Sequence, residues 1–309
     1  FDQPLLDTLL QQFPRDVLAL QVGHVLDYIT GDSEHMSARV SAVLPVWSKA
    51  LPGYHAVLAM RAFALVENAD YQSAADTALQ ALEFEPFDAR AHHALAHVYE
   101  MAGDAAGGVT WMQQRIGFWS NDTTVATHCW WHWALFHLSQ GKPADALALY
   151  DQRIRADRSS AVADMIDASA LLWRIDLLGA STGARWHELA SAWARHINDG
   201  FCTFNDLHAM LAFVGAEDWP HATQLECELL RRQHFANRHG ETTRLIGLPA
   251  CRAIVAFGRG DYARAVELCG TLPVFAHRIG GSQAQRDVLY LTLLESVQRI
   301  RRAPLRKAA

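Results

Sequence analysis

The stretch ENADYQSAADTALQALEFEP, residues 67–86, decides the fold class. Its apolar residues recur three and four positions apart, as they do on one face of an α-helix, and Pro86 closes the segment. An aromatic residue, Tyr71, is followed by small residues at Ala74 and Ala81. Small side chains at such positions let two helices approach closely. The stretch therefore predicts one half of a helical hairpin.

The same pattern recurs at three further places, in MAGDAAGGVTWM (101–112), SQGKPADALALYDQRI (139–154) and GRGDYARAVELCG (258–270). Small residues keep the register, with Ala62 and Ala74 in one unit, Ala96 and Gly108 in the next, and Ala134 and Ala146 in the third. This spacing is typical of the tetratricopeptide repeat (TPR), a pair of antiparallel helices. No sustained alternation of apolar and polar residues indicates a strand. The sequence predicts an all-α fold, a right-handed TPR-like superhelix of antiparallel helix pairs.

The repeat predicts one continuous domain over residues 1–309, with clear repeats at 54–156 and looser helix pairs at 1–53 and 160–302. Because the chain starts at Phe1 and not at Met, we expect that the true N-terminus lies before it. The helices expected within the clear repeats are 54–68, 71–85, 89–102, 104–118, 123–140 and 143–156.

The composition restricts the possible partners. A net charge of −6 disfavours nucleic acid, because phosphate binding needs a basic face. No apolar run approaches the roughly 18 residues of a membrane span, so we expect a soluble protein without a membrane partner. The sequence contains no signal-peptide pattern and no metal-type CxxC. We therefore expect a cytoplasmic protein with free thiols at all five cysteines, which are Cys129, Cys202, Cys227, Cys251 and Cys269.

Several segments resemble a known family when they are taken together in order. They are AHVYEM, HCWWHWALFHLSQGKPADALALYD, DASALLWR, RWHEL, FNDLHAML, LPACRAIVA and IGGSQAQRDV. Over residues 45–297 the chain looks like the tetratricopeptide repeat protein 38 family. The resemblance implies an all-α, TPR-like fold with more helices before the equivalent of Phe1, and it implies no particular reaction.

Six histidines and three tryptophans lie in residues 92–103 and 127–141. In a TPR unit, positions 2, 5, 9 and 12 of the first helix face the concave groove, and other positions pack on neighbouring helices. This register predicts that His92, His137, Trp130 and Trp133 are core residues. It predicts that a second set converges on one groove, namely His93, His97, Glu100, His128, Trp131 and His132.

Later helices carry further candidates. Asp164 and Asp167 lie three residues apart on one helical face, and we expect them, with His208, to line the same cavity. Asn205 and Asp206 are either further site candidates or, for one of them, the cap of the helix that carries His208. Arg286 follows a Gly-Gly turn and is expected to pair with a carboxylate. The predicted ligand-binding residues are His93, His97, Glu100, His128, Trp131, His132, Asp164, Asp167, His208 and Arg286.

Three functions remain open at this level. The first, which we prefer from the sequence, is a scaffold that binds a small molecule or peptide in the concave groove without a cofactor. The second is an enzyme that uses the His, Glu and Asp side chains as general acids and bases, or that uses a transition metal held by two i,i+4 pairs, His93/His97 and His128/His132. The third is a purely structural domain. The sequence does not determine the ligand, whether a reaction is catalysed, or the oligomeric state.

Overall fold

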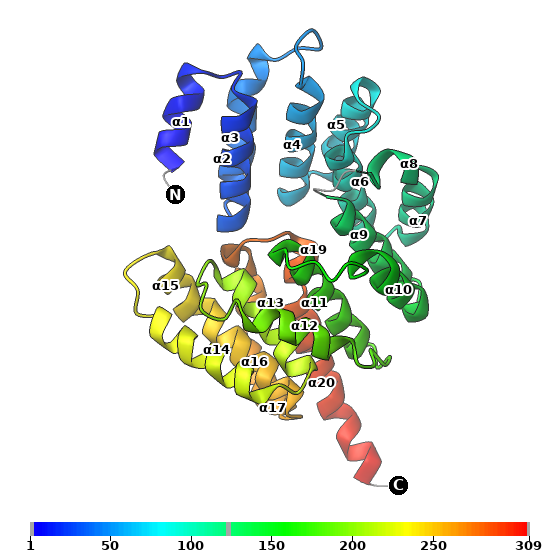
Figure 1. Cartoon of the computed structure of the whole chain (residues 1–309), viewed down its shortest axis with the longest axis vertical. Coiled ribbons are helices and arrows are strands. Elements are labelled where there is room, and N and C mark those ends of the chain that lie inside the picture. Colours follow the sequence, from blue (N-terminus) through cyan, green and yellow to red (C-terminus); the bar gives the residue numbers. More distant parts are fainter. Residues whose placement is uncertain (1–2, 122–124, 308–309) are drawn as a thin grey trace. The chain divides into compact units, whose positions relative to one another are not determined.

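The computed structural model describes residues 3–121 and 125–307, with side chains described up to Arg302. No strand occurs among these residues, so the prediction of an all-α fold is confirmed. The chain divides into two compact units, Phe1–Ile154 and Arg155–Ala309 (Figure 1). Among the described helices, none combines the length and the apolar character needed to cross a membrane. Each unit is described by itself, and the single continuous domain stays a prediction.

The first unit is a series of helical hairpins. Helix α4 contacts α5 and α6, and α6 contacts α7 and α9. A helix that touches both its neighbour in sequence and the helix after that is typical of stacked hairpins. The elements are α1 (Gln3–Gln12), α2 (Val17–Thr30), α3 (Ser33–Val43), the 3₁₀ turn η1 (Leu44–Val46), α4 (Tyr54–Glu67), α5 (Tyr71–Phe84), α6 (Ala89–Met101), α7 (Ala105–Gln114), α8 (Ile116–Trp119), α9 (Ala126–Ser139), α10 (Pro143–Leu149) and the π-helical turn η2 (Tyr150–Ile154).

The expected helix bounds are confirmed closely for α4, α5 and α6, which end within one residue of the predicted positions. The helix expected over 104–118 is interrupted at Arg115, where the backbone leaves the helical conformation and α8 follows. The helix expected over 143–156 is α10 continued by the π-helical turn η2. The expected start of α9, at 123–124, lies outside the described residues.

Aspartate side chains begin five of the helices described in the first unit. Asp16, Asp32, Asp70, Asp88 and Asp104 each accept a hydrogen bond from a backbone N–H in the first turn of the helix that follows. A capping carboxylate satisfies a donor that has no partner within the helix, and its charge is favourable at the positive end of the helix dipole. These residues explain why the hairpins turn at regular intervals.

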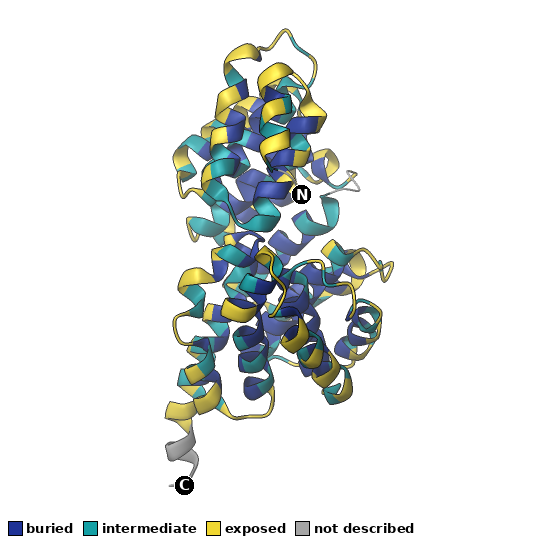
Figure 2. Ribbon diagram, turned by 90° about the vertical axis from the view of Figure 1, so that its left-hand side faces the viewer, coloured by how far each residue is buried: buried dark blue, intermediate teal, exposed yellow. Residues whose placement is uncertain are grey.

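Small residues permit the close packing of these hairpins. Ala62, Ala74, Ala96 and Ala134 are fully buried, at 0% exposure. A Cβ atom on Gly108 would lie 2.5 Å from the Phe136 ring, so α7 and α9 meet at a position that only glycine fits. Figure 2 shows the buried residues on the helix faces that meet other helices. The expected packing role of the small positions is thus confirmed.

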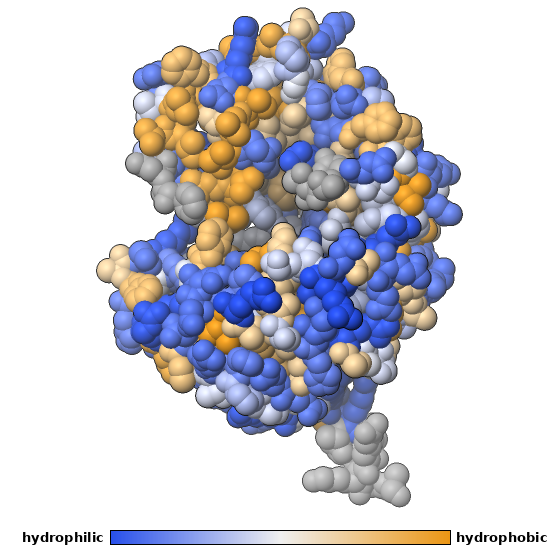
Figure 3. All heavy atoms as spheres, viewed as in Figure 1, coloured by the Kyte–Doolittle hydropathy of each residue, from blue (hydrophilic) through white to orange (hydrophobic). Residues whose placement is uncertain are grey.

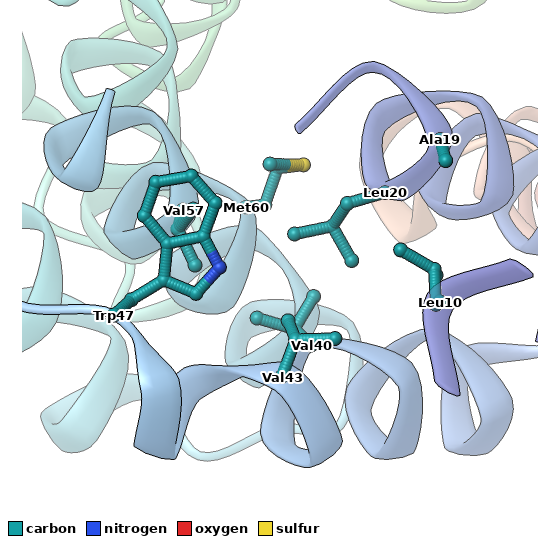
Figure 4. Close-up of a cluster of buried hydrophobic side chains, with 8 residues drawn as sticks. All are labelled: Leu10, Ala19, Leu20, Val40, Val43, Trp47, Val57 and Met60. Atoms are coloured by element: carbon teal, nitrogen blue, oxygen red, sulfur yellow. The ribbon is translucent and has the colours of Figure 1, made fainter. Parts of the chain in front are cut away.

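The core at the start of the first unit is formed by aliphatic side chains around one indole (Figure 4). Trp47, which lies after η1, packs near Val57 and Met60 of α4, and its Nε1 donates to the carbonyl oxygen of Pro14 at 3.0 Å. The full cluster is Leu10, Ala19, Leu20, Val40, Val43, Trp47, Val57 and Met60. It joins α1, α2, α3 and α4 into one packed group.

The opposite face of α2 remains apolar and exposed. Leu18, Val22 and Val25 form one stripe along the helix, and Leu18 is 71% exposed. Apolar side chains gather over these N-terminal helices in the view of Figure 3. The first hairpin therefore lacks the polar outer face that commonly ends a helical-repeat array.

The second unit is also built from packed helices, but its last helix returns to its first. Trp173 of α11 donates from Nε1 to the hydroxyl of Thr292 on α20 at 2.8 Å, and both side chains are buried. The unit contains α11 (Val162–Leu177), α12 (Arg185–Ala194), α13 (Thr203–Gly215), α14 (Trp219–Arg232), α15 (Arg238–Thr242), the π-helical turn η3 (Thr243–Gly247), α16 (Leu248–Gly258), α17 (Tyr262–Cys269), α18 (Leu272–Phe275), the 3₁₀ turn η4 (Ala276–Ile279), α19 (Gln283–Arg286) and α20 (Val288–Lys307).

Candidate metal centre

Helices α6 and α9 of the first unit carry the histidine cluster. Asp88 starts α6 by accepting from the backbone N–H groups of Arg90 and Ala91 at 3.0 and 3.2 Å. Residues four apart on a helix share one face, so His93 and His97 project together from α6. His128 and His132 do the same from α9, and the two helices contact each other. The sequence register therefore places four imidazoles between two packed helices.

The four imidazoles converge closely. One ring nitrogen from each of His93, His97, His128 and His132 lies within 4.8 Å of the others. The Nε2 atom of His97 is 2.9 Å from Nε2 of His93 and 3.2 Å from Nε2 of His132. In a tetrahedral zinc site with Zn–N bonds of 2.0–2.1 Å, neighbouring nitrogens are about 3.3 Å apart. The 3.2 Å separation is close to that spacing, and the 2.9 Å separation is shorter.

Glu100 sets the orientation of His132. Its Oε2 atom lies 2.8 Å from Nδ1 of His132, and a carboxylate accepts hydrogen bonds, so Nδ1–H is the donor. Neutral His132 then carries its lone pair on Nε2, the atom that faces His97. A carboxylate that holds the far nitrogen of a ligating histidine is the usual outer-shell arrangement of protein metal sites.

The three close Nε2 atoms compete for protons. A ring nitrogen carries either a proton or a lone pair, so Nε2 of His97 cannot donate to one neighbour and accept from the other. Because Nε2 of His132 presents a lone pair, the contacts with His93 and His132 compete for one position on His97. A cation among the rings would receive all three lone pairs without this competition. The arrangement thus suits a metal ion better than a network of hydrogen bonds alone.

Burial favours the neutral, metal-binding form of His93. Its pKa lies well below the ordinary value, chiefly because burial disfavours the charged ring, and the neighbouring His97, His128 and His132 lower it further. Histidine binds metals as the neutral imidazole, so this shift keeps the ligand available near neutral pH.

Aromatic side chains flank the cluster on both sides. Phe63 of α4 stacks on the His93 ring at 5.3 Å and 30°, and meets His97 edge-on at 5.4 Å. Trp131 stacks on His128 at 5.0 Å and 13°. Trp131, which was expected to face a groove, is fully buried, and its indole packs against the His128 ring. These rings restrict the rotation of the outer two histidines.

The remaining rings of the two helices are part of the packing. His92 is buried, lies 2.9 Å through Nε2 from the Pro86 carbonyl oxygen, and contacts the Trp111 ring. Trp130 and Trp133 stack on each other at 5.3 Å and 10°. His137 is partly buried and lies 4.0 Å from the Asp145 carboxylate. These contacts agree with the core role expected for these residues.

The second unit holds the later candidates. Asp167 on α11 is buried and accepts from Nε2 of Gln285 on α19 at 3.0 Å. His208 on α13 is fully buried, and its Nδ1 donates to the Phe204 carbonyl oxygen at 2.8 Å. Burial lowers the pKa of His208 to about 4. Asp164 lies on the same helix as Asp167 and is half-buried. That these residues share a cavity with the histidine cluster stays a prediction.

One local expectation in the second unit was wrong. Helix α13 begins at Thr203, so neither Asn205 nor Asp206 is its cap. Asp206 is instead buried and paired with Arg232 at 3.2 Å, because an unpaired buried charge would be costly. Arg286 donates to the backbone oxygen of Gly281, and its pairing with a carboxylate stays a prediction.

Two contributors escaped the sequence reasoning. Arg174 is buried on α11 and donates to Asp287, and its only signal was a charged residue within the apolar run ASALLWR. Phe63 is an aromatic residue in the apolar helix α4, with no polar group to mark it in the sequence, and its ring contacts two of the four histidines. No protein-family model matches the chain, so the functional assignment depends on the geometry of the site.

Proposed function

We propose that the first unit is a right-handed TPR-type scaffold that binds one divalent transition-metal ion between α6 and α9. The proposed ligands are the side chains of His93, His97, His128 and His132, with Glu100 orienting His132. The observation that carries this proposal is the convergence of four imidazole nitrogens within 4.8 Å. Imidazole ligands suit zinc, copper, nickel and iron, whereas calcium and magnesium prefer oxygen ligands.

The proposal extends to the setting of the site. The order of the sequence segments supports a relationship to the tetratricopeptide repeat protein 38 family. A cytoplasmic location is supported by the five cysteines, all of which are free thiols.

Metal content after reconstitution tests the proposal. Purified protein is loaded with zinc, dialysed against metal-free buffer and analysed for metal per chain. We expect one equivalent for the wild type and for His137→Gln, a variant of a histidine on α9 outside the cluster. The His97→Ala/His132→Ala double variant should retain none while keeping its helical circular dichroism. A wild-type protein that retains no zinc, copper, nickel or iron would contradict the proposal.

A metal-free site is the second candidate, because the 2.8 Å contact between Glu100 and His132 is also that of a general acid–base pair. In that case the groove would bind a small molecule or peptide directly, as the sequence first suggested. Ligand binding that persists in protein shown to be free of metal, and that is lost in His132→Gln, would favour this candidate.

A further inference from the structure

Resting on the metal ion proposed above, we propose that this ion keeps at least one coordination position for an external oxyanion. The oxyanion would bind on the side of His93 and His128, as hydroxide from water or as the carboxylate of a small organic acid. The site would then be an open, reactive centre and not a closed structural one.

The spacing of the nitrogens supports an open site. The short Nε2 separations are 2.9 and 3.2 Å, but the ligand atoms of the full set extend to 4.8 Å from one another. A closed tetrahedron would need every nitrogen pair at about 3.3 Å. Ligands on opposite sides of a five- or six-coordinate ion are about 4.2 Å apart, from metal–nitrogen bonds of roughly 2.1 Å. The 4.8 Å separation exceeds both values, so the four imidazoles form no closed tetrahedron, and the more distant ligands leave room beside the ion.

Burial is uneven across the cluster. His97 and His132 are 1% and 0% exposed, whereas His93 and His128 are only partly buried. Phe63 stacks on the His93 ring and Trp131 stacks on the His128 ring. This packing restricts the rotation of both outer rings. The inner pair therefore anchors the ion, and the outer pair borders the side from which an external ligand can approach.

The charge of the site selects an anion. Four neutral imidazoles leave a divalent ion with its full charge, and the closest carboxylate in the network, Glu100, acts through His132 and is itself 19% exposed. Arg90 adds positive charge, as its effect on His93 shows. An uncompensated charge in a partly buried site is costly, so an external anion stabilises the loaded state. Oxygen anions are suitable ligands for zinc and similar ions.

Water supplies the first such anion. A metal ion lowers the pKa of bound water to about 7 in open zinc sites. Water on the proposed ion would lose one proton to solvent and become hydroxide, and a carboxylate would displace that hydroxide, which would take up a proton and leave as water. Acetate and hydroxide therefore compete for one position.

Cobalt(II) in place of zinc makes this competition visible. The cobalt-loaded protein is titrated with sodium acetate at pH 6.5 and constant ionic strength, with perchlorate as the balancing salt. Its visible absorption is then followed from pH 6 to pH 9 with and without acetate. We expect a saturable spectral change with acetate, and a pH transition that acetate moves to higher pH. His137→Gln, the matched control, should behave as the wild type.

The outcomes separate the two proposals. Absence of cobalt bands in all samples would overturn metal binding itself. Cobalt bands that neither acetate nor pH changes would leave the metal site standing and overturn the open position. A change that perchlorate alone reproduces would also overturn it, because the effect would then be one of ionic strength and not of a bound oxyanion.

Discussion

Replacing Glu100 by Gln tests the part of the site that does not touch the metal. Glu100 accepts from Nδ1–H of His132 at 2.8 Å, and its negative charge makes the ring a better ligand. Gln keeps the size of the side chain and one acceptor oxygen but removes the charge. Loss of such an outer-shell carboxylate typically lowers metal affinity about 10- to 100-fold, or roughly 1.4–2.7 kcal/mol. We expect a loss in this range for E100Q.

A competition titration with a chromophoric chelator measures this loss. Zinc is distributed between the chelator and the protein, and the dissociation constants of wild type and variant are compared at pH 7.5. Glu83→Gln is the matched control, because Glu83 is an exposed carboxylate on α5 outside the cluster, and its affinity should equal that of the wild type. An unchanged affinity in E100Q would refute the role given to the Glu100–His132 contact. A loss of helical signal in E100Q would instead show a structural role.

Two predictions concern stability. Burial lowers the pKa of His24 to about 4, from an ordinary value of 6.5, so the unfolded chain binds this proton more tightly than the folded one. The corresponding stability, roughly 3 kcal/mol, is present above pH 6.5 and is lost as the pH falls towards 4. The H24Q variant can still donate to the Met60 oxygen, and urea unfolding should show that its unfolding free energy falls less than that of the wild type over that pH range. An equal fall in the two proteins would contradict this account. Gly108→Ala should lower the unfolding free energy by about 1–3 kcal/mol, because the new Cβ would lie 2.5 Å from Phe136. Gly117→Ala is the control and should not show this loss, because its Cβ would meet nothing within 4 Å. Equal melting temperatures for the two variants would argue against the close packing of α7 and α9.

The hairpins of the first unit were predictable because their signals are local. Alanine at regular positions specifies where helices meet, and an aspartate directly before a helix, as at α5 and α6, specifies where it begins. The break at Arg115 follows a glycine-rich helix of weak intrinsic propensity, and a single-sequence pattern does not locate such a break. The contact of Trp173 with Thr292 joins residues more than a hundred positions apart, and helical periodicity carries no information about it.

The site shows the same division. The i,i+4 spacing predicted that each histidine pair shares a helix face, and the repeat register predicted that the two faces meet. The preference for a metal site over a ligand-binding groove depends on the distances between the histidine nitrogens. Those distances depend on how closely α6 approaches α9, which the sequence pattern does not specify. Trp131 was placed by register alone, and the structure shows that its bulk fills a buried space. An aspartate near the start of a helix can either cap that helix or pair with a buried arginine, and the sequence does not distinguish the two. The structure shows that Asp206 pairs with Arg232.

X-ray absorption at the zinc edge of the loaded wild-type protein tests the central claim most directly. We predict a first shell of nitrogen or oxygen only, at about 2.0–2.2 Å, with the outer-shell scattering of several imidazoles. The imidazole signal should decrease in His128→Ala, which removes one ligand from α9. A sulfur shell near 2.3 Å, or a zinc environment without imidazole scattering, would contradict a metal centre built from His93, His97, His128 and His132.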